Sequence, residues 1–158
     1  MSKYVIAVMA LLLSITGAAQ ETRPDFSGTW IQIDGFGKSN DPDIEATTTI
    51  VQRPTEIRSS IAVRDKRKPN PERAPLVNTI RTDGTEERTV SGSTVTVSRA
   101  SWRGDRLVLD IVTSVNGKVV STGSRIWSLA SDGTLVIEAT TGTTSGQPAK
   151  TIMRFRRR

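Results

Sequence analysis

Apolar and polar residues alternate along most of the chain after residue 25. Residues 106–114 show the pattern most clearly: Leu107, Leu109 and Ile111 fall on one face, and Val108 and Asp110 fall on the other with Val112. A period of two is typical of a β-strand with one buried face. Apolar residues at helical spacing over three turns do not occur, and Val, Ile and Thr dominate. The pattern predicts an all-β domain.

Nine or ten short strands are predicted, separated by turn signals. Asp83-Gly84 and Asn116-Gly117 are residue pairs favoured in two-residue β-hairpins. The predicted strands are residues 26–33, 47–52, 56–63, 76–82, 85–89, 94–102, 106–114, 118–129, 134–141 and 150–156. Such regular spacing predicts an antiparallel up-and-down meander that closes into a β-barrel of about 8–10 strands, with a sandwich as the alternative.

Residues 64–75 interrupt the alternation. Pro69, Pro71 and Pro75 cannot donate hydrogen bonds to a strand ladder. The charged run before these prolines favours water. We therefore expect an exposed, Pro-, Lys- and Arg-rich loop over residues 64–75.

The first 19 residues have the three parts of a secretory signal peptide. Lys3 supplies a positive start, residues 4–15 are almost wholly apolar, and Gly17-Ala18-Ala19 supplies the small residues before a cleavage point. The apolar run is shorter than the about 20 residues that a membrane span needs. The sequence predicts cleavage after Ala19, export to the periplasm or outside the cell, a single domain over residues 20–158, and no membrane span after cleavage.

The amino-acid composition limits the metal sites, disulfides and catalytic groups that the chain can form. The 158 residues include no Cys and no His, so thiolate metal sites, disulfides and Ser-His-Asp catalysis are excluded. A Ser-Lys pair from Ser124 or Ser128 with Lys118 is conceivable, but strand residues of these types usually face solvent. Asp110 and Glu138 could face solvent, pair with Arg or line a barrel. We predict no catalytic residue, no metal and no cofactor, and hence a protein that is not an enzyme.

Residues 24–30, which end in Gly28-Thr29-Trp30, resemble the opening of the calycin superfamily, which includes the lipocalins and fatty-acid-binding proteins. The resemblance implies that Trp30 closes one end of a barrel and that Gly28 lets the backbone turn beside it. It also implies an Arg late in the barrel that packs on this Trp. Arg154 and Arg156 share a face of the last strand, and we expect Arg154, which lies deeper, to fill this role.

A second resemblance covers the chain from about residue 25 to its end. The blocks 26–30, 102–109 and 127–135 resemble, in this order, those of small secreted bacterial proteins described as lipocalin-like and of unassigned function. Relatives often carry Lys after the first Trp and Ala-Lys-Ser further on, where this chain has Ile31 and Gly37-Lys38-Ser39. The resemblance implies the barrel and no particular ligand.

Four residues are candidates for a ligand-binding site inside the barrel. Trp102 and Trp127 could form its wall, with core packing as the alternative. Arg99 or Arg125, if it points inward, would be a buried cation that a fatty-acid-type carboxylate could neutralise. The alternative is that each points outward and pairs with an acidic residue on a neighbouring strand.

Two functions remain open. The first is binding of one small apolar or amphiphilic molecule inside the barrel. The second is a non-enzymatic interaction protein with a filled core that contacts anionic surfaces through its basic exterior and terminal Arg cluster, since the formal charge is +6. Few aromatic residues accompany the basic ones, so we do not expect nucleic acid as a partner. Cavity volume discriminates the two functions.

Overall fold

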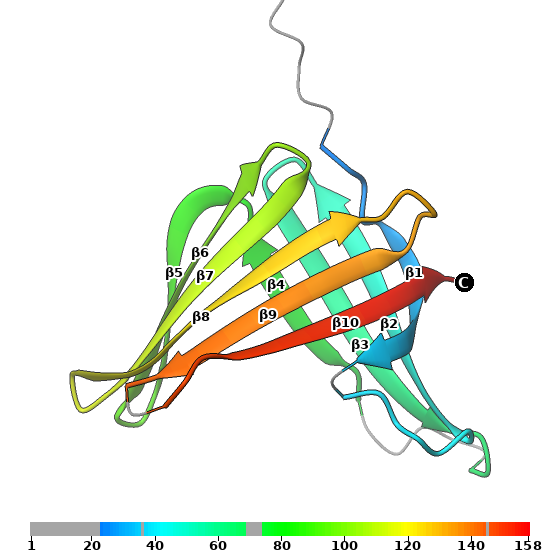
Figure 1. Cartoon of the computed structure of the whole chain (residues 1–158), viewed down its shortest axis with the longest axis horizontal. Coiled ribbons are helices and arrows are strands. Elements are labelled where there is room, and N and C mark those ends of the chain that lie inside the picture. The colour runs from blue at the N-terminus through cyan, green and yellow to red at the C-terminus, as the bar shows by residue number, and fades with distance from the viewer. Residues whose placement is uncertain (1–22, 36, 69–73, 145) are drawn as a thin grey trace, which may run out of the picture.

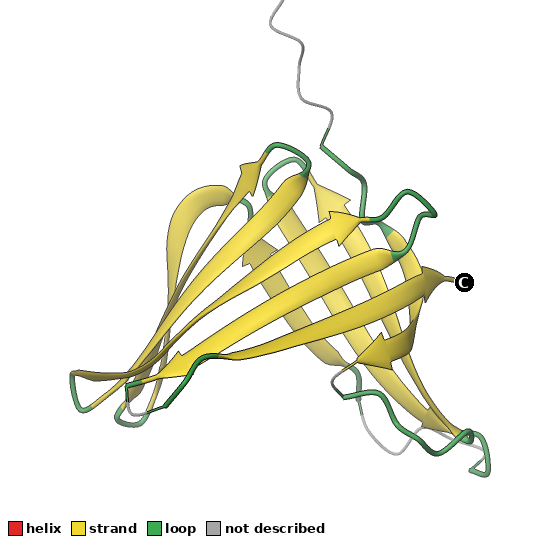
Figure 2. Cartoon of the chain, in the orientation of Figure 1, coloured by secondary structure: helices red, strands yellow, loops and turns green. Residues whose placement is uncertain are grey.

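The computed structural model describes residues 23–35, 37–68, 74–144 and 146–158, so the predicted signal peptide lies outside the described residues. These residues are all-β and form ten strands (Figures 1 and 2). They are β1 (Gly28–Gly35), β2 (Ile44–Arg53), β3 (Glu56–Asp65), β4 (Leu76–Arg81), β5 (Asp83–Ser91), β6 (Thr94–Arg103), β7 (Arg106–Val115), β8 (Lys118–Leu129), β9 (Leu135–Thr143) and β10 (Ala149–Arg157). Among these described residues, no helix is long and apolar enough to cross a membrane.

The strands form one antiparallel sheet in the order β4-β3-β2-β1-β10-β9-β8-β7-β6-β5. First and last strands pair with each other, since β1 forms a ladder with β10. The sheet thereby curls into a nearly closed barrel, as the meander pattern predicts. Its two edges are β4 and β5, which follow each other in the chain but do not share a ladder.

The two hairpin signals have different outcomes. Asn116 and Gly117 adopt positive φ angles of 51° and 75° in the turn between the paired strands β7 and β8, which confirms the predicted hairpin. The hairpin predicted at Asp83-Gly84 is wrong, because β4 and β5 are the unpaired edges. Gly84 has a φ of 83°, and the Asp83 carboxylate accepts hydrogen bonds from Thr85 and Arg81. These contacts build a corner at which the chain crosses the gap.

The predicted loop over residues 64–75 starts later than expected. β3 continues through Arg64 and Asp65, which pair with Glu45 and Ile44 of β2. The Arg67 side chain then donates hydrogen bonds to the carboxylates of Asp65 and Asp41, at 2.8 and 3.0 Å. This charged cluster fixes the turn that leaves the strand.

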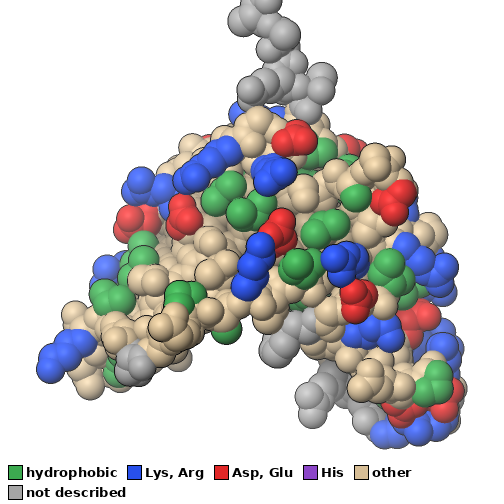
Figure 3. All heavy atoms as spheres, in the orientation of Figure 1, with side chains coloured by type: hydrophobic (Ala, Val, Ile, Leu, Met, Phe, Trp, Pro, Cys, Tyr) green, Lys and Arg blue, Asp and Glu red, His purple; other side chains and the backbone are tan. Residues whose placement is uncertain are grey.

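The core gathers at the end of the barrel where β1 begins and β10 ends. Its buried members come from nine strands and from the segment before β1: Phe26, Trp30, Ile50, Ile57, Ile80, Ala100, Leu107, Leu109, Trp127, Leu135, Ile137 and Phe155. At the opposite end the hairpins diverge into two arms, and the surface is hollowed between them (Figures 1 and 3). The barrel therefore has a packed end and an open mouth.

Candidate ligand-binding site

Trp30 closes the packed end of the barrel. Its side chain is fully buried, and its indole Nε1 donates a hydrogen bond of 2.9 Å to the carbonyl oxygen of Phe26. The segment before β1 is held across this end by Gln52, whose side chain accepts from the Phe26 amide and donates to the Pro24 carbonyl. This end of the cavity is therefore sealed by the chain itself.

Arg157, and not Arg154, packs on Trp30. The Arg157 guanidinium lies 4.7 Å from the centre of the Trp30 ring, in the geometry of a cation–π contact. Gly28 makes room for it, since a Cβ at Gly28 would lie 3.2 Å from an Arg157 nitrogen. Trp30 is fully buried at the barrel end and Gly28 has a positive φ of 135°, while the prediction that Arg154 packs on Trp30 is wrong.

Register explains the error. Trp30 and Arg157 are direct partners in the ladder between β1 and β10, so their side chains share the inner face. Arg154 has the opposite parity on β10. Its guanidinium donates to the Asp34 carboxylate at 2.7 Å on the exposed side of the sheet. Strand parity alone therefore separates Arg154 from the barrel end.

Trp102 belongs to the seal and not to the cavity wall. Its ring stacks on Phe26 with 5.6 Å between the ring centres, and the Arg23 guanidinium lies 5.6 Å from the same ring. It lines neither of the two cavities described below. Core packing, the alternative considered for Trp102, is what the structure shows.

Two adjoining cavities lie on the inner side of the barrel formed by the described residues. The first, the apolar chamber, has a volume of about 470 Å³. The second, the hydroxyl chamber, has a volume of about 580 Å³ on the inner wall of β7 to β10 toward the mouth. The apolar chamber is lined by Thr48, Ile50, Ser59, Ile61, Leu76, Val77, Asn78, Arg125, Trp127, Leu135, Ile137, Met153 and Phe155. The hydroxyl chamber is lined by Ile111, Thr113, Ser121, Thr122, Gly123, Ser124, Arg125, Ala139, Thr140, Thr141, Thr151 and Met153.

Arg125 stands where the chambers meet. It lies two residues from Trp127 on β8, and so on the same face, and it pairs with Leu109 and Ala139. Arg125 therefore belongs to the inner face. Within the described residues its guanidinium has no hydrogen bond and no ion pair. The side chain is solvent-exposed through the open mouth, so it is an inward cation but not the fully buried one considered from the sequence. Water can hydrate it until an anion replaces that water.

Trp127 lies two residues further along the same face. It is 6 % exposed and lines the apolar chamber. Its indole Nε1 is buried and has no hydrogen-bond partner among the described residues. Buried donors are nearly always paired, so this N–H is one that a ligand oxygen or a water can satisfy. Trp127 and Arg125 together present donors and no acceptor from neighbouring positions.

Arg99 lies outside the site. Its guanidinium pairs with Glu86 of the neighbouring strand at 3.4 Å, and both side chains are exposed. Its neighbour Ala100 is buried in the core, which places Arg99 on the outer face. The outward alternative considered for Arg99 is what the structure shows.

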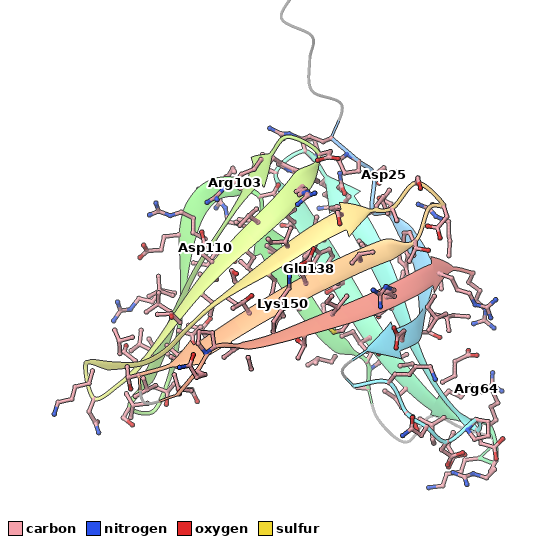
Figure 4. The ribbon with its side chains drawn as sticks, in the orientation of Figure 1. Asp25, Arg64, Arg103, Asp110, Glu138 and Lys150 are labelled. Carbon is pink, nitrogen blue, oxygen red and sulfur yellow. The ribbon has the colours of Figure 1, made fainter. Side chains whose placement is uncertain are left out.

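The strand carboxylates also point away from the cavity. Asp110 pairs with Arg103 at 3.7 Å, and Glu138 pairs with Lys150 at 2.8 Å, along the outer face of the sheet (Figure 4). The hydrogen bond from Lys150 lowers the pKa of the Glu138 carboxyl. Neither chamber has a carboxylate in its lining, and no group of acidic residues suited to a metal ion occurs in the described part of the chain. The linings of the two chambers are therefore positive, with Arg125 as their charge.

Several lining residues did not emerge from the sequence. Met153 touches both chambers, and Ser59 and Asn78 add polar groups to the apolar one. Met153 could have been predicted from the sequence, because it lies two residues from the buried Phe155 on β10 and therefore on the same face. Ser59 and Asn78 needed the pairing of β3 with β4, which no local pattern reveals.

Comparison with solved structures decides the fold. A secretory abundant heat soluble protein from Ramazzottius varieornatus matches with a TM-score of 0.53 at 12 % identity, over 84 % of this chain and 95 % of that one. A protein named REP1-NXSQ fatty acid transporter matches with a TM-score of 0.52 at 13 % identity, over 84 % and 95 % of the two chains. This chain has the lipocalin-like β-barrel fold that these proteins share.

The predicted fold is thereby confirmed. A second secretory abundant heat soluble protein from Ramazzottius varieornatus, protein 4, gives a TM-score of 0.50 at 12 % identity over 84 % and 94 % of the two chains. No protein-family model matches the sequence, and no curated protein matches it. At these identities the likeness concerns the fold, and the site must be argued from the residues themselves.

Proposed function

We propose that this barrel binds one anionic amphiphile, with its apolar tail in the apolar chamber and its negative group at Arg125. One observation carries the proposal: an inward guanidinium without a partner among the described residues, in a cavity without a carboxylate. A carboxylate or phosphate would make charge-assisted hydrogen bonds with it. The buried Nε1 of Trp127 adds a donor near the same position.

Size and polarity support a lipid tail. The chamber of about 470 Å³ lies within the usual range of ligand sites, about 300–1,000 Å³. Ile50, Trp127, Leu135 and Phe155 line it with apolar surface. Each methylene buried there contributes about 0.8 kcal/mol. The fold is shared with a protein named as a fatty acid transporter, which is consistent with this ligand class.

The alternative surface role has less support. Two cavities of this size do not fit a filled core. The terminal arginines are partly engaged within the fold: Arg154 pairs with Asp34, Arg158 pairs with Glu45, and Arg157 covers Trp30. Less free charge is therefore left for an external anionic surface than the sequence indicates.

The proposed role is carriage, not catalysis. The chain has no His or Cys, and the linings of the two chambers offer no carboxylate as a general base. We further propose that residues 1–19 direct export, so that the domain would work outside the cytoplasm; mass spectrometry of exported protein should then find a start at or near Gln20.

Titration of palmitate against the intrinsic tryptophan fluorescence tests the binding proposal. Arg125→Met removes the charge and keeps a similar side-chain length, and Arg99→Met is the matched control on the outer face. We expect Arg125→Met to weaken palmitate binding by about 10- to 150-fold, since a hydrogen bond to a charged group contributes about 1.5–3 kcal/mol. Arg99→Met should bind as the wild type does. Equal affinities for wild type and Arg125→Met, or no binding by either, would overturn the proposal.

A further inference from the structure

The cation lies in the middle of the hollow and not at its end. The apolar chamber continues from Arg125 toward the packed end, and the hydroxyl chamber continues from Arg125 toward the mouth. Arg125 and Met153 are the residues that line both. A ligand with its charge at one terminus, such as a fatty acid, would fill the first chamber and leave the second to water.

Seven of the twelve residues that line the second chamber are Ser or Thr. Thr113 pairs directly with Ser121, and Thr141 pairs with Gly123, which has the parity of Ser121 on β8, so the side chains of Thr113, Ser121 and Thr141 share the inner face. Thr151 joins them from β10 through its pairing with Ala139. None of these four hydroxyls makes a hydrogen bond to another group in the described residues. Each can therefore donate and accept a hydrogen bond with a ligand.

The charge pattern of the hydroxyl chamber restricts what can fill it. Its lining has no acidic residue, no aromatic ring and no cation besides Arg125. A quaternary ammonium or an amine would meet neither a carboxylate nor an aromatic face, the two groups that bind such cations. It would also be repelled by Arg125. An uncharged group rich in hydroxyls fits this wall best.

The apolar chamber restricts the tail. Its volume equals that of about 16 water-sized groups at ~30 Å³ each, which suits one acyl chain and not two. The packed end beyond it is sealed by Phe26 and Trp30, so the tail enters from the open side of the chamber, where Arg125, Ile61 and Leu76 are exposed. A bound ligand would therefore have its tail in the apolar chamber, its anionic group at Arg125 and its head in the hydroxyl chamber.

We propose that the ligand is a single-chain amphiphile whose anionic group is internal, between an acyl tail and an uncharged hydroxyl-bearing head. Lysophosphatidylglycerol has this chemistry, with its phosphodiester at Arg125 and its glycerol among the hydroxyls of Thr113, Ser121, Thr141 and Thr151. The proposal rests on the proposed function, because it assigns the class of ligand to the same site. It differs from that function in giving the hydroxyl chamber a share of the binding.

The test compares three ligands with one and the same acyl chain, below their micelle concentrations, by isothermal titration calorimetry. They are the free fatty acid, lysophosphatidylglycerol and lysophosphatidylcholine. We expect lysophosphatidylglycerol to bind at least about tenfold more tightly than either of the others, because two or more extra hydrogen bonds form with its head.

A double variant assigns this preference to the chamber. Thr113→Val with Thr141→Val removes two hydroxyls and keeps the side-chain shape, and Thr49→Val, on an exposed position of β2, is the control. The double variant should lose most of the preference for lysophosphatidylglycerol and keep its affinity for the fatty acid. The control should change neither.

The outcomes separate this inference from the proposed function. Fatty acid bound as tightly as lysophosphatidylglycerol, or a preference that survives in the double variant, would overturn the internal-anion proposal and leave the binding function intact. Preference for lysophosphatidylcholine would overturn it as well. Binding of none of the three ligands would overturn both.

Discussion

Replacement of Trp30 tests the seal at the packed end. Trp30→Ala removes a fully buried indole, its hydrogen bond to the Phe26 carbonyl and its contact with the Arg157 guanidinium. Large-to-small changes of buried aromatic residues cost about 3–5 kcal/mol. That is a large part of the about 5–15 kcal/mol by which a domain is stable. For a domain of this size we expect the melting temperature to fall by about 12–20 °C.

Two further variants divide this loss into its parts. Trp30→Phe keeps a ring in the core but removes the donor to Phe26, for which we expect about 1–2 kcal/mol. Arg157→Met removes the cation–π contact, for which we expect about 0.5–1 kcal/mol. The double variant Trp30→Ala with Arg157→Met should lose less stability than the sum of the losses in the two single variants. The reason is that the Arg157 contact is already lost once the indole is gone.

The assay is urea denaturation followed by far-ultraviolet circular dichroism, with an unchanged denaturant slope as the sign that the folded state is intact. Trp102→Ala is the control, since Trp102 is only partly buried, and it should cost less than Trp30→Ala. A melting temperature for Trp30→Ala within about 3 °C of wild type, or strict additivity with Arg157→Met, would refute this account of the seal.

Other expectations follow from the same contacts. Arg154→Ala should cost under about 1 kcal/mol in urea denaturation, because its pair with Asp34 is exposed; a loss as large as that of Trp30→Phe would contradict its placement. Gly117→Ala should lower stability by about 1–2 kcal/mol, since Gly117 has a φ of 75° and the cost is in the backbone alone; an unchanged midpoint would argue against the turn. Palmitate binding should weaken as pH falls below about 4.3, the reference value for a carboxyl, because the charged form that Arg125 favours disappears, while a phosphodiester should bind as before; a pH-independent palmitate affinity would contradict the ion pair.

Local alternation was sufficient to predict the strands but not their closure. The sequence around Leu107, Leu109 and Ile111 has one inward face whatever the partner strands are, and the structure confirms that face. The gap between β4 and β5 was missed because Asp83-Gly84 is a local turn signal. A corner and a hairpin both need a glycine with positive φ there. Which of the two forms depends on distant strands.

In the candidate site, too, some positions follow from the local sequence and others depend on distant strands. The inward position of Arg125 could have been read from the sequence, because it lies two residues from Trp127 and so on the same face of the strand. The outward position of Arg99 could have been read likewise, because it lies one residue from Ala100 and three from Trp102 and so on the opposite face. Arg157 could not, because its place opposite Trp30 depends on the ladder of β1 with β10 and on an irregularity between Gln32 and Asp34. The two chambers also depend on the curl of the whole sheet, which residue types do not specify.

A crystal structure of the complex with 16-bromohexadecanoic acid tests the central claim most directly, because anomalous scattering locates the bromine at the end of the tail. We expect the carboxylate at about 2.7–2.9 Å from the Arg125 guanidinium and the bromine in the apolar chamber beside Trp127 and Leu135. Bromine among the hydroxyls of Thr113 and Thr141, or a ligand bound outside the barrel with Arg125 still hydrated, would contradict it.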